Sequence, residues 1–191
     1  MKPQNLGLVQ VYTGDGKGKT TTALGLAFRA SGHGYSTYII QFLKGATYLG
    51  EVDASKKNPS IHMAQYGQPC PWSDELKNGR IRCGTCRYCF AIHKDDEKRS
   101  LKGIEFARKV LTSGKYDIVV LDEINVAMDK KLVPVNLVLD LIKEKSPKTE
   151  LVLTGRGAPK EILEVADLVT EMKDVRHPMK KNYVGRKGID Y

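Results

Sequence analysis

The sequence lacks long hydrophobic runs, and its few cysteines are confined to one region. No apolar stretch approaches the roughly 20 residues of a membrane-spanning helix, which argues against a transmembrane segment. The first residues carry no apolar core like that of a secretory signal, so we expect a cytoplasmic protein. All 4 cysteines lie between positions 70 and 89, whereas a secreted disulfide framework would distribute them along the chain.

Repeats and low-complexity tracts are also lacking. Hydrophobic residues make up 41% of the 191 residues and charged residues 28%, which excludes a disordered or collagen-like chain. This length corresponds to one domain, or to one domain with an inserted subdomain. The net charge of +9 favours anionic partners, whether nucleic acid, phosphorylated small molecules or an acidic protein, and does not choose among them.

Short apolar segments alternate with segments of helical spacing. Because the expected strands are continuously apolar, they predict an α/β fold with a mostly parallel central sheet and helices on both faces. We expect one domain over residues 1–191, a cysteine-bearing insertion at 67–93 and a basic C-terminal tail at 173–191. The expected strands are 6–12, 36–42, 61–66, 116–121, 151–153 and 168–169, and the expected helices are 19–30, 101–111, 134–142 and 159–166.

Residues 13–20, TGDGKGKT, lie between the first expected strand and the first expected helix, which is the context that a phosphate-binding P-loop requires. Glycines let successive N–H groups face an anion, and the helix N-terminus adds partial positive charge. Lys19 can reach the outer phosphates, and the Thr20 hydroxyl can bind Mg²⁺. The loop therefore predicts a bound nucleoside triphosphate.

Residues 118–123, IVVLDE, predict a buried strand that ends in two carboxylates. Asp122 and Glu123 would emerge at the carboxyl end of the sheet, where open α/β sheets bind ligands, and one of them can hold Mg²⁺. Hydrolysis, phosphoryl transfer and alkyl transfer all start from a bound triphosphate, so these motifs do not identify the reaction.

Several motifs together resemble the P-loop ATP:corrinoid adenosyltransferases of the cobalamin-salvage type. The matches occur in family order over nearly the whole chain: residues 13–21, 29–34, 41–45 (QFLKG), 119–123 (VVLDE), 153–157 (LTGRG) and 188–191 (GIDY). The resemblance implies a P-loop NTPase, RecA-like fold and a transferase of cobalamin biosynthesis. In that reaction the cobalt(I) of cobalamin or a precursor attacks the 5′ carbon of ATP, and triphosphate leaves.

The resemblance also implies roles for individual residues. Thr20 and Glu123 are the best candidates for the magnesium site, with Asp122 beside them, and a cobalt(I) nucleophile needs no general base. Implied partners are a second copy of the chain and a flavoprotein or ferredoxin reductant. The residues expected to contact the nucleotide are Gly14, Asp15, Gly16, Lys17, Gly18, Lys19, Thr20, Thr21 and Arg156.

Members of this family strip the axial ligand from cobalt with a Phe-x-Trp segment. The matching stretch is residues 70–72, CPW, in which Trp72 matches and Cys70 occupies the phenylalanine position. Trp72 is therefore expected on the corrinoid face. With Lys19, Thr20 and Glu123 it completes the expected catalytic set.

The spacing of Cys83, Cys86 and Cys89, with Cys70 upstream, is not a feature of that family. Three cysteines at two-residue intervals predict a thiolate-bound metal. Zinc and a [4Fe–4S] cluster both fit the pattern, and free or disulfide-bonded thiols are the third alternative.

Two other functions remain open at this level. A nucleoside kinase of the thymidine-kinase type also joins a P-loop core to a four-cysteine zinc site, although residues 41–45 and 188–191 argue against it. A basic nucleic-acid-binding ATPase would fit the net charge. The chain has no interleaved aromatic and basic residues of the kind that bind single strands.

Overall fold

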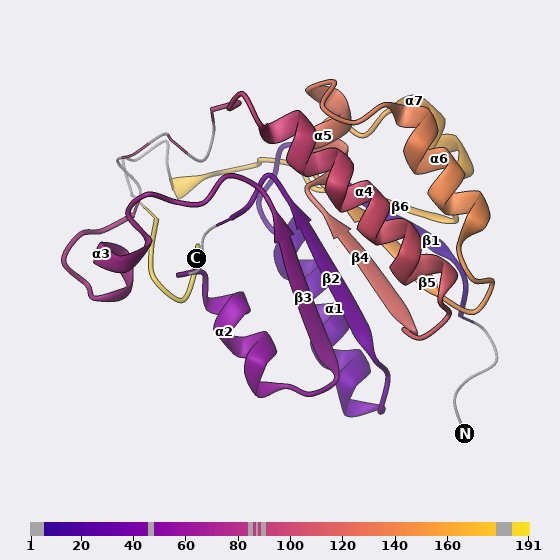
Figure 1. Ribbon diagram of the computed structural model, residues 1–191, viewed down its shortest axis with the longest axis horizontal. Helices are drawn as coiled ribbons and strands as arrows, with labels where there is room; N and C mark the ends of the chain where they lie inside the picture. Colours follow the sequence, from indigo (N-terminus) through magenta and orange to yellow (C-terminus); the bar gives the residue numbers. More distant parts are fainter. Residues whose placement is uncertain (1–5, 46–47, 84–85, 87, 89–90, 179–184) are drawn as a thin grey trace.

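A computed structural model describes residues 6–45, 48–83, 86, 88, 91–178 and 185–191. These residues form a six-stranded, all-parallel sheet with the order β3-β2-β4-β5-β1-β6 (Figure 1). The strands are β1 (Val9–Thr13), β2 (Thr37–Phe42), β3 (Ile61–Tyr66), β4 (Ile118–Asp122), β5 (Glu150–Thr154) and β6 (Leu168–Glu171). The parallel sheet confirms the α/β fold that the sequence predicted.

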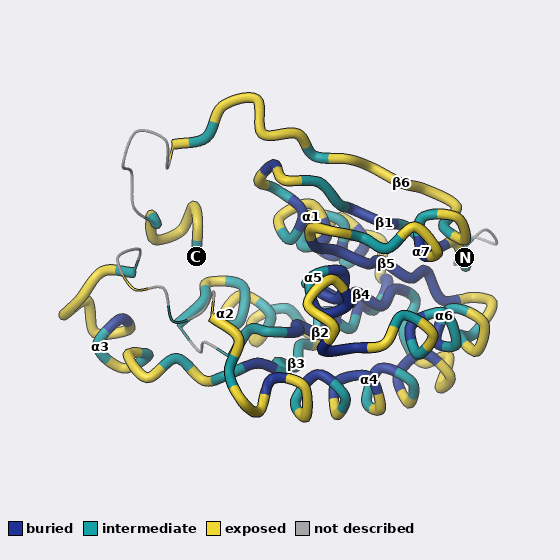
Figure 2. The backbone as a smooth tube through the Cα atoms, turned by 90° about the horizontal axis from the view of Figure 1, so that it is seen from above, coloured by how far each residue is buried: buried dark blue, intermediate teal, exposed yellow. Residues whose placement is uncertain are grey.

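Helices cover both faces of the sheet (Figures 1 and 2). The helices are α1 (Lys19–Gly32), α2 (Gly50–Lys57), α3 (Ser73–Lys77), α4 (Asp96–Thr112), α5 (Ile124–Asp129), α6 (Val135–Glu144) and α7 (Lys160–Val165). One face packs against α1, and the other packs against α4, α5, α6 and α7. Among the described residues no helix is both long and apolar enough to cross a bilayer.

The two central strands explain why the sequence signal was strong. Every residue of β4 and β5 is buried, because helices cover both faces of the sheet. A strand that is buried on both sides needs a continuous run of apolar residues, which is the pattern that predicted these two strands. On one face, Ala23, Ala27 and Ala30 of α1 are buried against the sheet. Their spacing places three small side chains on one side of the helix, which lets α1 lie close to the strands.

The described part of residues 67–93 contains one short helix, α3, and Pro69 near its start forms an isolated parallel bridge with Gly45. That this segment is a cysteine-bearing insertion stays a prediction. After β6, whose four residues are all exposed, the described tail runs outward (Figure 2). Residues 185–191 return to the main body, where the Tyr191 ring meets Tyr48 with 5.5 Å between centroids.

Candidate active site

The loop between β1 and α1 has a backbone that requires glycine. Gly14 and Gly18 adopt φ values of +90° and +118°, a region that side chains rarely enter. At Gly16, a Cβ atom would lie 2.7 Å from the Met172 carbonyl oxygen, to which the Gly16 N–H donates at 2.6 Å. The helix that follows has no side-chain cap and no acidic residue in its first turn. Its N-terminal N–H groups are therefore suited to an anion.

Lys19 lies within the curl of this loop. Its Nζ donates to the carbonyl oxygens of Gly14 and Gly16, each at 2.6 Å, and the residue is only 8% exposed. Burial lowers the pKa of Lys19, and the positive charge of Arg156 lowers it further. The loop therefore holds one desolvated cation in a fixed position, where it can interact strongly with a phosphate.

Asp122, at the end of β4, is the centre of a hydrogen-bond network. Its Oδ1 accepts from the hydroxyls of Thr20, at 2.8 Å, and Thr154, at 2.6 Å. Its Oδ2 accepts from Lys44 Nζ, at 2.8 Å, and Gln41 Nε2, at 3.1 Å. Burial alone would raise the pKa of Asp122, but the Lys44 charge and the hydrogen bonds hold it below its usual range. Asp122 is thus a buried, ionised carboxylate.

Glu123 follows directly and has an unusual backbone. Its φ of +63° is left-handed, a conformation that costs a non-glycine residue roughly 1–2 kcal/mol. The Glu123 N–H donates to Thr154 Oγ1 at 3.0 Å, which ties the strained residue to the Asp122 network. Burial, followed by the repulsion from Asp122, raises the pKa of Glu123 despite the nearby Lys44. Strain of this kind is concentrated at functional sites.

The oxygens of this network suit a hard divalent cation. Thr20 contributes a hydroxyl and Asp122 and Glu123 contribute carboxylates, and Mg²⁺ is commonly bound by one or two carboxylates together with phosphates and water. No group of three or more His, Cys, Asp or Glu side chains that could hold a metal occurs within the described ranges. The donor set therefore fits a magnesium ion that arrives with phosphate ligands of its own.

Arg156 and Lys17 lie on the outer side of the P-loop. Arg156 Nη2 donates to the Asp15 carbonyl oxygen at 3.2 Å, although its side chain remains 62% exposed. Lys17 forms an ion pair with Asp190, which also accepts from Arg186 Nε at 3.0 Å. The C-terminal GIDY motif is thereby fastened to the phosphate loop, a contact between residues 173 positions apart.

The residues predicted to cover the corrinoid and to bind a metal through thiolates lie outside the P-loop and the Asp122 network. Trp72 directly precedes α3 and is 49% exposed. Helix α3 lies at the same end of the molecule as the C-terminus (Figure 1). Cys83 Sγ lies 3.2 Å from the Tyr48 hydroxyl, and Cys86 is exposed. Cys89 lies outside the described residues, and the structure brings no metal-binding cluster together from the described cysteines. The thiolate site stays a prediction.

Three members of the Asp122 network were not predicted as site residues: Gln41, Lys44 and Thr154. Gln41 and Lys44 lie in the QFLKG motif and Thr154 lies in the LTGRG motif. Both motifs were recognised in the sequence, but no role was predicted for these three residues. Their roles depend on strand order. The β2 and β5 strands flank β4, and their carboxyl ends therefore meet at Asp122.

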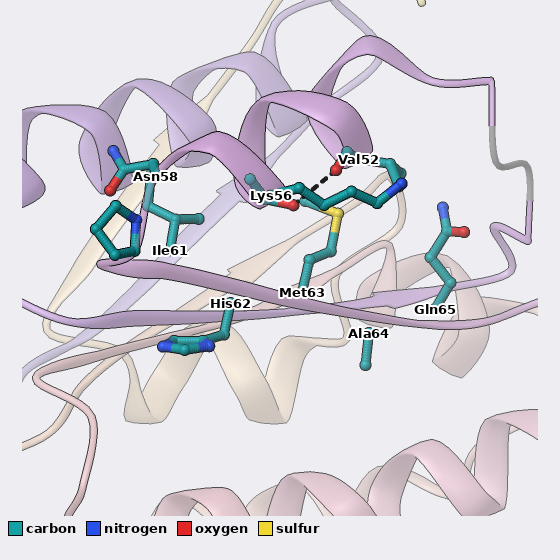
Figure 3. A pocket seen from close by; sticks show the side chains of 10 residues that line it. Val52, Lys56, Asn58, Ile61, His62, Met63, Ala64 and Gln65 are labelled. Carbon is teal, nitrogen blue, oxygen red and sulfur yellow. Dashed lines mark hydrogen bonds between the residues drawn. The ribbon is translucent and has the colours of Figure 1, made fainter.

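A separate hollow lies between α2 and the edge strand β3 (Figure 3). Its lining includes Val52, Ile61 and Met63, together with the polar side chains of Lys56 and Gln65. It reaches the Asp122 network through Gln65 Nε2, which donates to Gln41 Oε1 at 2.9 Å. None of the described residues that line the hollow carries a carboxylate.

Comparison with known proteins adds independent information. The family model described as ATP:corrinoid adenosyltransferase BtuR/CobO/CobP matches residues 5–191. A corrinoid adenosyltransferase from Sinorhizobium sp is 33% identical, with 100% of this chain and 83% of the relative aligned. Corrinoid adenosyltransferases from Pseudomonas aeruginosa and Escherichia coli K12 are 32% and 30% identical, each aligned with 97% of this chain and with 84% and 86% of their own lengths.

Proposed function

This chain belongs to the ATP:corrinoid adenosyltransferase family, and we propose that Lys19, Thr20, Asp122 and Glu123 carry the ATP side of its reaction. The enzyme transfers the adenosyl group of ATP to a corrinoid, as the sequence resemblance implied, and neither a nucleoside kinase nor a nucleic-acid ATPase is favoured. One observation carries the residue assignment. The P-loop hydroxyl of Thr20 donates to the buried Asp122, 102 residues away in the sequence.

The site residues match the charge that this reaction develops. The cobalt(I) electron pair forms the bond to C5′, and the pair of the breaking C5′–O bond leaves with triphosphate. Lys19 is held in place by two loop carbonyl oxygens before the charge appears, which is the arrangement that stabilises a leaving anion best. Magnesium bound with ATP supplies further positive charge. Because Thr20 donates its proton to Asp122, its oxygen presents its lone pairs to cations, and one of them accepts from Lys44 Nζ at 3.1 Å.

Thr20→Val tests the assignment. The substitution keeps the shape of the side chain but removes the oxygen, so we expect magnesium to enhance ATP binding roughly 10- to 100-fold less than in the wild type, as for groups that hold or orient metal ligands. Titration calorimetry of ATP with and without Mg²⁺ measures this difference. Thr22→Val, at an exposed position in the same helix, is the matched control. Wild-type magnesium dependence in Thr20→Val would contradict the assignment.

We further propose that Trp72 covers the corrinoid face, a role supported by its match to the family motif and by its exposed position. Trp72→Ala should lose most of the activity when cobalt(II) is supplied with a flavoprotein reductant. It should lose much less when cobalt(I) is generated chemically, because the reduction step is bypassed. Phe28→Ala, which removes an exposed aromatic side chain from α1, is the control. Equal losses under both regimes would assign Trp72 to packing.

For the cysteine segment we propose a metal bound by Cys70, Cys83, Cys86 and Cys89, either zinc or a [4Fe–4S] cluster, and the support is their spacing. Zinc would hold residues 67–93 together, whereas a cluster would also be able to pass an electron to cobalt. Metal content and the ultraviolet–visible spectrum of anaerobically purified protein distinguish the two. If the purified protein contains neither zinc nor iron, the four cysteines are ordinary thiols and the proposed metal site is wrong.

The proposed setting of the enzyme follows the family. We propose a single P-loop domain over residues 1–191, with the insertion at 67–93 and the tail at 173–191, in a cytoplasmic homodimer that receives electrons from a flavoprotein or ferredoxin. Cobalamin or one of its precursors would be the corrinoid. The sequence resemblance supports the dimer, the reductant and the corrinoid, whereas composition and cysteine usage support the insertion, the tail and the compartment.

A further inference from the structure

Lys44 occupies a position that is unusual for a lysine ammonium group. Its Nζ lies 2.8 Å from Asp122 Oδ2 and 3.1 Å from Thr20 Oγ1, and 4.0 Å from Glu123 Oε1. These are the same three side chains that we assign to the magnesium site. The Lys44 side chain is 24% exposed and Asp122 is 1% exposed, so the ion pair is largely removed from water.

The hydrogen-bond directions show which acceptor atoms Lys44 occupies. Thr20 has one hydroxyl proton, which goes to Asp122, so it receives the Lys44 proton on an oxygen lone pair. One lone pair of Thr20 remains, but a metal ion bound by both Thr20 and Asp122 would have to lie between the two oxygens that Lys44 Nζ already bridges. The second carboxylate oxygen of Asp122 is likewise already bonded to Lys44 and Gln41.

We propose that the Lys44 ammonium and the divalent cation compete for one position, so that Lys44 acts as a built-in cation of the metal site. This rests on the proposed function, because it takes Thr20 and Asp122 as the metal-site residues. A free metal ion has to displace a charged group that is already hydrogen-bonded, and it meets the repulsion of that charge. A metal bound to triphosphate brings phosphate oxygens, which can accept the displaced ammonium.

The consequence is an ordered use of the site. Lys44 keeps Asp122 ionised and fixes the Thr20 side chain without a metal, so the site is formed before substrate arrives. The metal ion enters together with the nucleotide. Lys44 is therefore a positioning residue for Thr20 and Asp122, and in the absence of ATP it weakens the binding of a free metal ion.

Lys44→Met removes the charge while keeping an unbranched side chain, and Mn²⁺ without nucleotide is the probe. We expect Mn²⁺ to bind Lys44→Met with a Kd at least about tenfold lower than that of the wild type, measured from the electron paramagnetic resonance signal of free Mn²⁺. Lys44→Arg keeps the charge and should bind Mn²⁺ as weakly as the wild type. Lys56→Met is the matched control, because Lys56 pairs with the exposed Asp53 at 3.0 Å.

Loss of the Lys44 charge also leaves Asp122 without its counterion, so thermal unfolding is the second readout. Mn²⁺ should raise the Tm of Lys44→Met more than that of the wild type, and it should restore folding if the variant unfolds without metal. Equal Mn²⁺ affinity in Lys44→Met and wild type, or no rescue by Mn²⁺, would overturn the competition. If Thr20→Val meanwhile loses magnesium-dependent ATP binding, the proposed function survives that failure; if it does not, the metal site itself is misassigned.

Discussion

Lys19→Ala is expected to lower turnover on the order of 10²-fold or more, the loss typical of a preorganised charge removed from a transition state. Lys19 Nζ is held by two loop carbonyl oxygens and is almost fully buried, so no other side chain of the loop supplies a cation at that point. The assay is turnover with ATP and a chemically reduced corrinoid, which isolates adenosyl transfer from cobalt reduction.

Lys160→Ala provides the control for Lys19→Ala. Lys160 is 86% exposed and makes an ion pair with Glu164 on α7, so its removal changes the net charge equally without touching the loop. Turnover of this variant should match that of the wild type. Near-normal turnover in Lys19→Ala would show that the loop does not hold the departing triphosphate.

Asp122→Asn is expected to have the largest effect on stability. It leaves Lys44 without its carboxylate partner, and breaking a buried ion pair on one side costs about 3 kcal/mol or more. For a chain of this size that loss lowers the Tm by roughly 6–12 °C. Asp53→Asn makes the same chemical change in the exposed pair with Lys56, where solvent screens the charges and little change in Tm is expected. Equal Tm values for the two variants would contradict the account of the network.

The pH dependence of this difference is fixed by the direction of the pKa shift. The pKa of Asp122 is lowered in the folded protein, so its stabilisation is fully present above the unfolded pKa of about 3.9. It is lost as the pH falls through the folded pKa, when the carboxyl group becomes protonated. Unfolding free energies of wild type and Asp122→Asn should therefore converge in acid and differ by a constant amount at neutral pH.

Contiguous motifs explain what could be predicted from the sequence. Each of these motifs carries its structural signal in consecutive residues. In the P-loop the signal is the glycines of a tight turn, and in the VVLDE strand it is an apolar run buried between two covered sheet faces. Lys44, Gln41 and Thr154 could not be placed at Asp122 in the same way. Their convergence depends on β2 and β5 being the neighbours of β4, which only the order of the sheet determines.

Elements without hydrophobic periodicity were missed for a different reason. Helix α2 has no buried residue, so it carries no apolar stripe for a pattern to detect. The short helices α3 and α5 span 5 and 6 residues, less than two turns each. The docking of the C-terminal motif on the P-loop depends on a contact between Lys17 and Asp190, and no local pattern encodes a pairing at that separation.

The most direct test of the central claim is the stoichiometry of the products. With ATP and a cobalt(I) corrinoid, the account predicts one mole of intact triphosphate for each mole of cobalt–carbon bond formed, and no turnover of ATP when the corrinoid is omitted. Accumulation of ADP and orthophosphate without corrinoid would mean that the P-loop serves hydrolysis, and it would contradict the assignment of Lys19, Thr20, Asp122 and Glu123 to adenosyl transfer.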